Sequence, residues 1–137
     1  MSAHSRKTRV GFEMWRKTKS KTYFRERVKM SNLRGHKLLT KELRKLLPPL
    51  YFTEKKNVKP LAVVKFFSPY TGWKWYATEF DGEDTFFGWV QGFENELGYF
   101  SLKELETVTV MGDVPAIERD LSFQPTPLSE IQAEAHD

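Results

Sequence analysis

Three apolar segments follow one another between residues 61 and 90, and short turn sequences separate them. The first, LAVVKFF (61–67), is a continuous apolar run typical of a buried strand, and the second, WKWYATEF (73–80), alternates as a half-buried strand does. The third is FFGWV (86–90). Ser, Pro and Gly lie between the first two segments, and an Asp-Gly pair follows the second. This order predicts an antiparallel meander of three strands.

The alternation in the second segment assigns its side chains to two faces. One face is expected to carry Trp73, Trp75, Ala77 and Glu79, and the other Lys74, Tyr76, Thr78 and Phe80. Of the three tryptophans Trp73, Trp75 and Trp89, we expect at least two in the core.

The flanking sequence predicts helices and shorter strands. Thr40 is a good N-cap for a helix with a leucine stripe, which Pro48 and Pro49 end. Ser101 and Glu104 form a capping box that starts a short helix. We further expect a polar loop at 53–60 and a polar or helical turn at 94–98. Strands are expected at 107–110 and 117–123. A final helix is expected at 128–133, with Thr126 as its N-cap.

These elements predict an α+β fold: a small antiparallel sheet of about four to five strands with an N-terminal helix and two short helices, preceded by a basic flexible leader. We expect residues 1–37 to form this leader, disordered or loosely docked, and residues 38–131 to form a single domain. Residues 132–137 are expected to be a frayed tail.

Charge is divided unevenly along the chain. Residues 1–60 hold 18 Lys and Arg against 4 Asp and Glu, whereas residues 61–137 hold 4 against 14. A basic segment can neutralise phosphates, and aromatic residues among its cations can stack on bases. The leader therefore predicts contact with DNA or RNA through Arg16, Lys17, Lys19, Lys21, Arg25 and Lys29. The alternatives are a leader that lies on the protein's own acidic surface or is simply solvated.

The acidic half gathers four carboxylates near one turn: Glu79, Asp81, Glu83 and Asp84. Such a group can bind a divalent cation or perform acid–base chemistry, but its spacing does not match a calcium loop, and a solvated turn is the favoured interpretation. Alternatively, these acids imitate phosphates and, together with Trp73 and Trp75, bind a host protein.

Several function classes lack support in the sequence. There is no cysteine, so disulfides and cysteine–zinc sites are excluded. The histidines are only His4, His36 and His136, and no phosphate-binding glycine motif is present. We therefore predict no catalytic residue, metal site or cofactor. No apolar run is long enough to span a bilayer, so we expect no membrane partner and a cytoplasmic location.

Three stretches resemble the domain-of-unknown-function 2958 family: LLTKELRKLLPPLY (38–51), the segment 64–106 with EFDGEDTFFG and ELGYFSL, and PAIERDLSFQPTPLSEI (115–131). The resemblance covers about residues 38–131 and leaves the leader outside. It implies a small bacterial protein carried on plasmids or other mobile elements, and it implies no activity, ligand or catalytic residue.

The sequence favours a non-enzymatic binding or accessory protein of a bacterial mobile element that contacts nucleic acid through its leader. One alternative is an inhibitor or adaptor that binds a host protein through the acidic sheet face. A second alternative is a metal-dependent hydrolase that uses the acidic turn.

Overall fold

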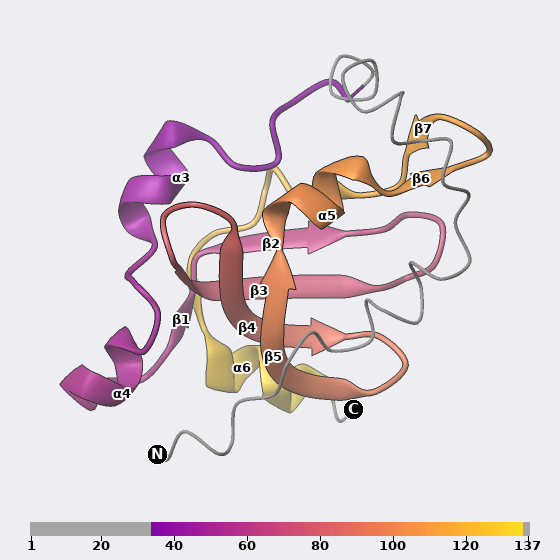
Figure 1. Ribbon diagram of the computed structural model, residues 1–137. Helices are drawn as coiled ribbons and strands as arrows, with labels where there is room; N and C mark the ends of the chain where they lie inside the picture. Colours follow the sequence, from indigo (N-terminus) through magenta and orange to yellow (C-terminus); the bar gives the residue numbers. More distant parts are fainter. Residues whose placement is uncertain (1–33, 136–137) are drawn as a thin grey trace.

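The fold is built around a five-stranded antiparallel sheet in the order β5-β4-β3-β2-β8 (Figure 1). The computed structural model describes residues 34–135. The strands of this sheet are β2 (Val64–Phe67), β3 (Lys74–Phe80), β4 (Thr85–Gln91), β5 (Asn95–Ser101) and β8 (Glu118–Arg119). The sheet and the short helices around it confirm the predicted α+β class and the meander at its centre.

Short helices and two-stranded ribbons complete the described part of the chain. The helices are α3 (Lys41–Leu46), α4 (Phe52–Lys56), α5 (Leu102–Thr107) and α6 (Leu128–Glu134). The ribbons pair β1 (Leu61–Ala62) with β9 (Thr126–Pro127), and β6 (Thr109–Val110) with β7 (Val114–Pro115). None of these helices has the length and apolar character needed to cross a bilayer.

The main core lies on one face of the sheet, where α5 and the residues that flank α3 cover it. A row of phenylalanine rings crosses the strands, with centroids 4.6 Å apart for Phe80 and Phe86 and 5.2 Å apart for Phe86 and Phe100. Trp75 is completely buried beside them. Such closely packed rings account for much of the burial available to a sheet of this size.

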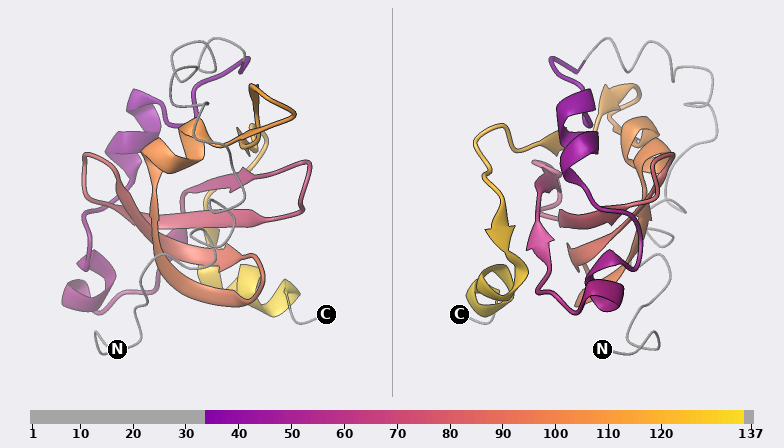
Figure 2. Two further views of the ribbon diagram at one scale, coloured as in Figure 1. Left: turned by 45° about the vertical axis from the view of Figure 1, so that its right-hand side comes forward. Right: turned by 90° about the vertical axis from the view of Figure 1, so that its left-hand side faces the viewer.

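A smaller apolar cluster occupies the opposite face, under α6 and the β1–β9 ribbon (Figure 2, right). It joins Tyr76 and Trp89 of the sheet to Leu128 and Ile131 of α6. The predicted strand 61–67 is therefore divided: its first two residues pair with β9, and residues 64–67 join the sheet. One continuous apolar run thus contributes a strand to the β1–β9 ribbon and a strand to the five-stranded sheet.

A β-bulge in β3 changes the predicted division of its two faces. The register between β3 and β4 shifts between Ala77 and Glu79, so Thr78 is an extra residue. After the bulge, Phe80 packs in the main core with Trp75, although strict alternation had placed these two side chains on opposite faces. The alternation rule fails here because one inserted residue reverses every later side chain.

Two predicted helix starts are confirmed by their caps. Thr40 Oγ1 accepts a hydrogen bond from Leu43 N, and Ser101 Oγ accepts one from Glu104 N. The leucine stripe is only partly right, because Leu47 is buried while Leu46 is 59% exposed.

Four other boundaries differ from the sequence expectations. Residues 95–101 form β5 rather than a turn, and the polar loop 53–60 contains most of α4. The strand expected at 117–123 is reduced to β8. The final helix extends to Glu134, into the expected tail, and its N-cap is Pro127 rather than Thr126, which pairs in β9.

Candidate functional site

The six basic leader residues proposed to contact nucleic acid lie outside the described residues 34–135. The part of the leader that the structure does describe is held against the domain. Arg34 Nε donates to the carbonyl of Ile117 at 2.9 Å, and His36 Nε2 accepts from the backbone N–H of Arg119 at 3.0 Å. Residues 34–37 are therefore attached to β8 and its surroundings, N-terminal to the expected domain boundary.

The acidic turn is organised by its own hydrogen bonds. Asp81 Oδ1 accepts from the backbone N–H groups of Glu83, Asp84 and Thr85 at 2.8–3.0 Å. Slight burial acts to raise the pKa of Asp81, but these donors outweigh it and hold the pKa below its usual value. Asp81 thus fixes the shape of the turn.

Asp84 connects this turn to α5. Its Oδ2 accepts from Ser101 Oγ at 2.6 Å, and its Oδ1 accepts from the backbone N–H of Lys103 at 2.7 Å. Its carboxylate therefore supplements the cap of α5, where a helix N-terminus favours a negative charge.

Glu79 is completely buried and points away from that turn. Its carboxylate accepts from the backbone N–H of Tyr51 at 2.8 Å, and from both the backbone N–H and the hydroxyl of Thr53 at 3.0 and 2.7 Å. Tyr51 is the N-cap of α4 and has a positive φ of 70°. Glu79 thereby anchors the start of α4 to the sheet.

The four predicted acids are therefore not assembled as one site. Only Asp81 and Glu83 are exposed at the surface. Among the described residues, no group of three or more His, Asp or Glu side chains is placed to hold a metal ion.

Both tryptophans of the predicted protein-binding patch are buried. Trp75 has no exposed surface and Trp73 retains 8%. The ring of Trp73 packs edge-on against Phe93, with the centroids 4.9 Å apart. The expectation that at least two of the three tryptophans belong to the core is confirmed, since Trp89 is also 8% exposed.

Exposed cations are concentrated on α3, α4 and the residue shortly after α4. Between residues 41 and 59 there are six Lys and Arg, and all six side chains are exposed; Glu42 and Glu54 are the only acids. Figure 2 (right) shows α3 above α4 on the side of the molecule that faces the viewer. We call this surface the basic edge, formed by Lys41, Arg44, Lys45, Lys55, Lys56 and Lys59.

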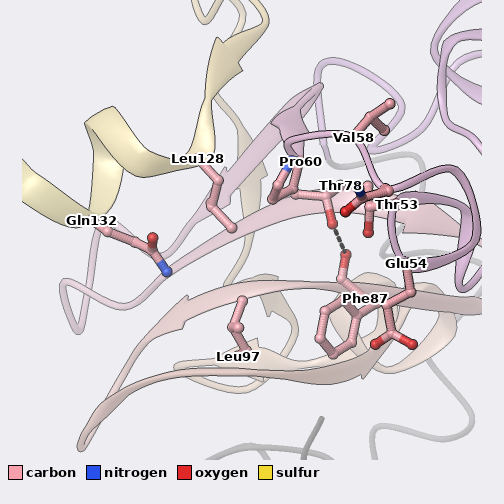
Figure 3. A pocket seen from close by; sticks show the side chains of 10 residues that line it. Thr53, Glu54, Val58, Pro60, Thr78, Phe87, Leu97, Leu128 and Gln132 are labelled. Atoms are coloured by element: carbon pink, nitrogen blue, oxygen red, sulfur yellow. Dashed lines mark hydrogen bonds between the residues drawn. The ribbon is translucent and has the colours of Figure 1, made fainter. Parts of the chain in front are cut away.

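A cleft of about 280 Å³ opens on the second sheet face beside the basic edge. Its walls come from α4, from α6, and from strands β3, β4 and β5 (Figure 3). In Figure 3, Leu128 and Gln132 reach into the gap from α6, while Leu97 reaches into it from β5. Thr78 Oγ1 donates to the carbonyl of Phe87 at 3.0 Å, so the bulge residue forms part of the wall.

Sequence reasoning did not find this cleft. Its lining residues are spread from Thr53 to Gln132, over a segment predicted as a loop, two predicted strands, a predicted turn and the predicted final helix. The one local sign of the cleft was that residues 53–57 and Gln132 are polar, but polar residues are also typical of solvated loops.

The comparisons with known proteins identify a family alone. A model of the family described as "Protein of unknown function (DUF2958)" matches residues 38–137. No curated protein and no solved structure matches the chain.

Proposed function

The chain belongs to the DUF2958 family, and on that premise we propose that it is a non-enzymatic nucleic-acid-binding protein that accompanies bacterial mobile elements. In this proposal both the leader and the basic edge contact phosphates. The leader contributes the residues named from the sequence, Arg16 to Lys29, and the basic edge contributes the six exposed cations between residues 41 and 59.

The exposed cations of the basic edge are the observation that supports the proposal. A cation contributes to phosphate binding when it is exposed and not already neutralised by the protein. No ion pair is formed by the basic-edge lysines within residues 34–135, where the ion pair found is that of Lys65 with Asp120 at 3.5 Å. Arg44 is partly occupied, because it donates to the carbonyl of Gly82.

The positions of the carboxylates support binding rather than catalysis. Glu79 and Asp84 accept hydrogen bonds that hold α4 and the start of α5 in place. A catalytic carboxylate must be free to exchange protons or ligands with a substrate. These two side chains instead serve the fold.

The alternative of a host-protein adaptor has weaker support, because its expected anchors are inside the molecule. Aromatic side chains dominate most binding hot spots. Trp73 and Trp75 are buried, and of the four predicted acids only Asp81 and Glu83 are exposed.

The test compares two exposed lysines in the full chain. Binding of a fluorescent oligonucleotide is measured by anisotropy at low salt for wild type, Lys56→Gln and Lys103→Gln. Lys103 is the matched control, since it is exposed on α5 and is not one of the six basic-edge residues. We expect Lys56→Gln to weaken binding of a single strand and to make the slope of log K against log salt shallower by roughly 0.7. Lys103→Gln should change neither quantity much. Equal affinities for the three proteins would contradict the role of the basic edge.

The leader is tested separately by replacing Arg16, Lys17, Lys19, Lys21, Arg25 and Lys29 with Gln in one variant. We expect a loss of affinity larger than that of Lys56→Gln, because six charges are removed. Undiminished binding by this variant would exclude the leader as a contact surface.

A further inference from the structure

The cleft on the second sheet face has the size of a single flat ring system. Pockets for drug-sized ligands typically measure about 300–1,000 Å³, and this cleft, at about 280 Å³, lies at the small end of that scale. A group with its own extended substituents would not fit entirely inside, whereas a single ring with its substituents outside would.

The walls of the cleft combine apolar surface with a few polar groups. Leu97, Leu128 and the ring of Phe87 supply apolar surface, and the amides of Asn57 and Gln132 and the carboxylate of Glu54 supply hydrogen-bonding groups. Each amide offers both a donor and an acceptor. A flat heterocycle with apolar faces and an edge that carries donors and acceptors is the chemical complement of such walls, and a nucleobase has this character.

The basic edge adjoins this cleft through α4. Thr53, Glu54 and Asn57 line the cleft, while Lys55 and Lys56 in the same helix are exposed to solvent and Lys59 follows shortly after. A base seated in the cleft would therefore have cations next to the phosphates that flank it. Because the carboxylate of Glu54 lines the cleft itself, negative charge on the ligand fits only outside the cleft, beside the exposed lysines.

We infer that the cleft between α4 and α6 receives one unpaired base of a single-stranded nucleic acid, whose neighbouring phosphates contact Lys55, Lys56 and Lys59. This inference rests on the proposed function and assigns its preferred substrate. A base in a duplex has to leave its stack and its partner base to reach such a site, which costs free energy that an unpaired base does not lose. The protein should therefore prefer single strands to duplexes of equal length.

The experiment measures the affinity of the full chain for a single-stranded oligonucleotide and for a hairpin duplex with the same number of phosphates. The variants are Gln132→Ala, which removes an amide from the cleft, and Leu97→Trp, which fills it. Gln124→Ala is the matched control, because Gln124 is exposed and does not line the cleft. Thermal unfolding of each variant verifies that it is folded, and Gln132→Ala still gives an answer if Leu97→Trp does not fold.

We expect wild type and Gln124→Ala to favour the single strand, and both cleft variants to lose about tenfold in single-strand affinity while duplex binding is unchanged. Lys56→Gln should weaken the binding of both the single strand and the duplex. Equal affinity of wild type for both ligands, or an unchanged preference in the cleft variants, would overturn the inference and leave the proposed function standing. A wild-type protein that binds neither ligand at low salt would overturn the proposed function itself.

Discussion

Glu79 shows how a single buried carboxylate can position an element that lies far away in sequence. Its two oxygens accept three hydrogen bonds from Tyr51 and Thr53, about 26 residues earlier in the chain. These donors are at the start of α4, where Thr53 and Glu54 line the cleft. The residue that looked like a surface acid in the sequence is therefore a structural support of the candidate site.

Replacing Glu79 with Ala should destabilise the protein strongly. The substitution leaves two backbone N–H groups without their acceptor in a partly buried position, at an expected cost of about 2–4 kcal/mol. The free energy of unfolding in urea measures this effect. Glu83→Ala is the control, because Glu83 is exposed in the same acidic turn and should change stability by less than about 0.5 kcal/mol. Similar values for the two variants would contradict the anchoring role of Glu79.

Gly88 allows the two central strands to approach each other at the bulge. A Cβ atom at this position would lie 1.8 Å from the backbone oxygen of Tyr76, which is far inside contact distance. We expect Gly88→Ala to cost about 3 kcal/mol or more, because a backbone oxygen cannot move aside as a flexible side chain can. Gly35→Ala is the matched control, since a Cβ there meets nothing within 4 Å. A thermal melting temperature for Gly88→Ala equal to that of Gly35→Ala would refute this interpretation.

At the scale of elements, the sequence predicted those whose signals are local. The helix starts at Thr40 and Ser101 were found because each cap forms within three residues. Strands β3 and β4 were found because their apolar residues and the adjoining turn identify a meander. Such features need no knowledge of the rest of the fold.

Elements that depend on distant partners were missed. Strand β5 contains Asn95, Glu96 and Gly98, which are poor strand formers, and it is extended because it pairs with β4 along its whole length. Helix α4 has only five residues and depends on Glu79 for its start. The cleft combines these missed elements with α6, so local patterns could not have revealed it.

The attachment of the segment Arg34–Lys37 to the domain is expected to depend on pH through His36. His36 accepts a hydrogen bond from Arg119 N, which requires a neutral ring nitrogen. Burial lowers the pKa of His36, and the positive charges of Arg119 and Arg34 lower it further, although Glu118 opposes them. Because the folded pKa lies below the ordinary value of 6.5, the folded protein binds fewer protons than the unfolded chain.

The stabilisation by His36 should therefore be complete above about pH 6.5 and should decline as the pH falls from there through the folded pKa. Urea unfolding of wild type and His36→Ala between pH 5 and pH 8 measures it. We expect wild type to be the more stable protein at pH 8 and the difference to shrink toward pH 5. A difference that stays constant or grows as the pH falls would contradict the proposed attachment.

At the scale of the whole molecule, the question is whether the two oppositely charged halves of the chain neutralise each other in the fold. They meet at some places: Arg34 donates to the carbonyls of Ile117 and Glu106, and Arg44 donates to the carbonyl of Gly82 in the acidic turn. The basic edge nevertheless keeps its cations on the surface, with six Lys and Arg against two acids over residues 41–59. The acids of the turn are meanwhile largely occupied with shaping the β3–β4 turn and the start of α5.

The central claim is that this surplus of positive charge binds phosphates, and salt dependence tests it most directly. The affinity of the full chain for a single-stranded oligonucleotide is measured across a series of salt concentrations. We predict that log K falls linearly with log salt, with a slope steeper than about −2, because three or more phosphates would be neutralised. A slope near zero, or no binding at the lowest salt concentration, would contradict the account.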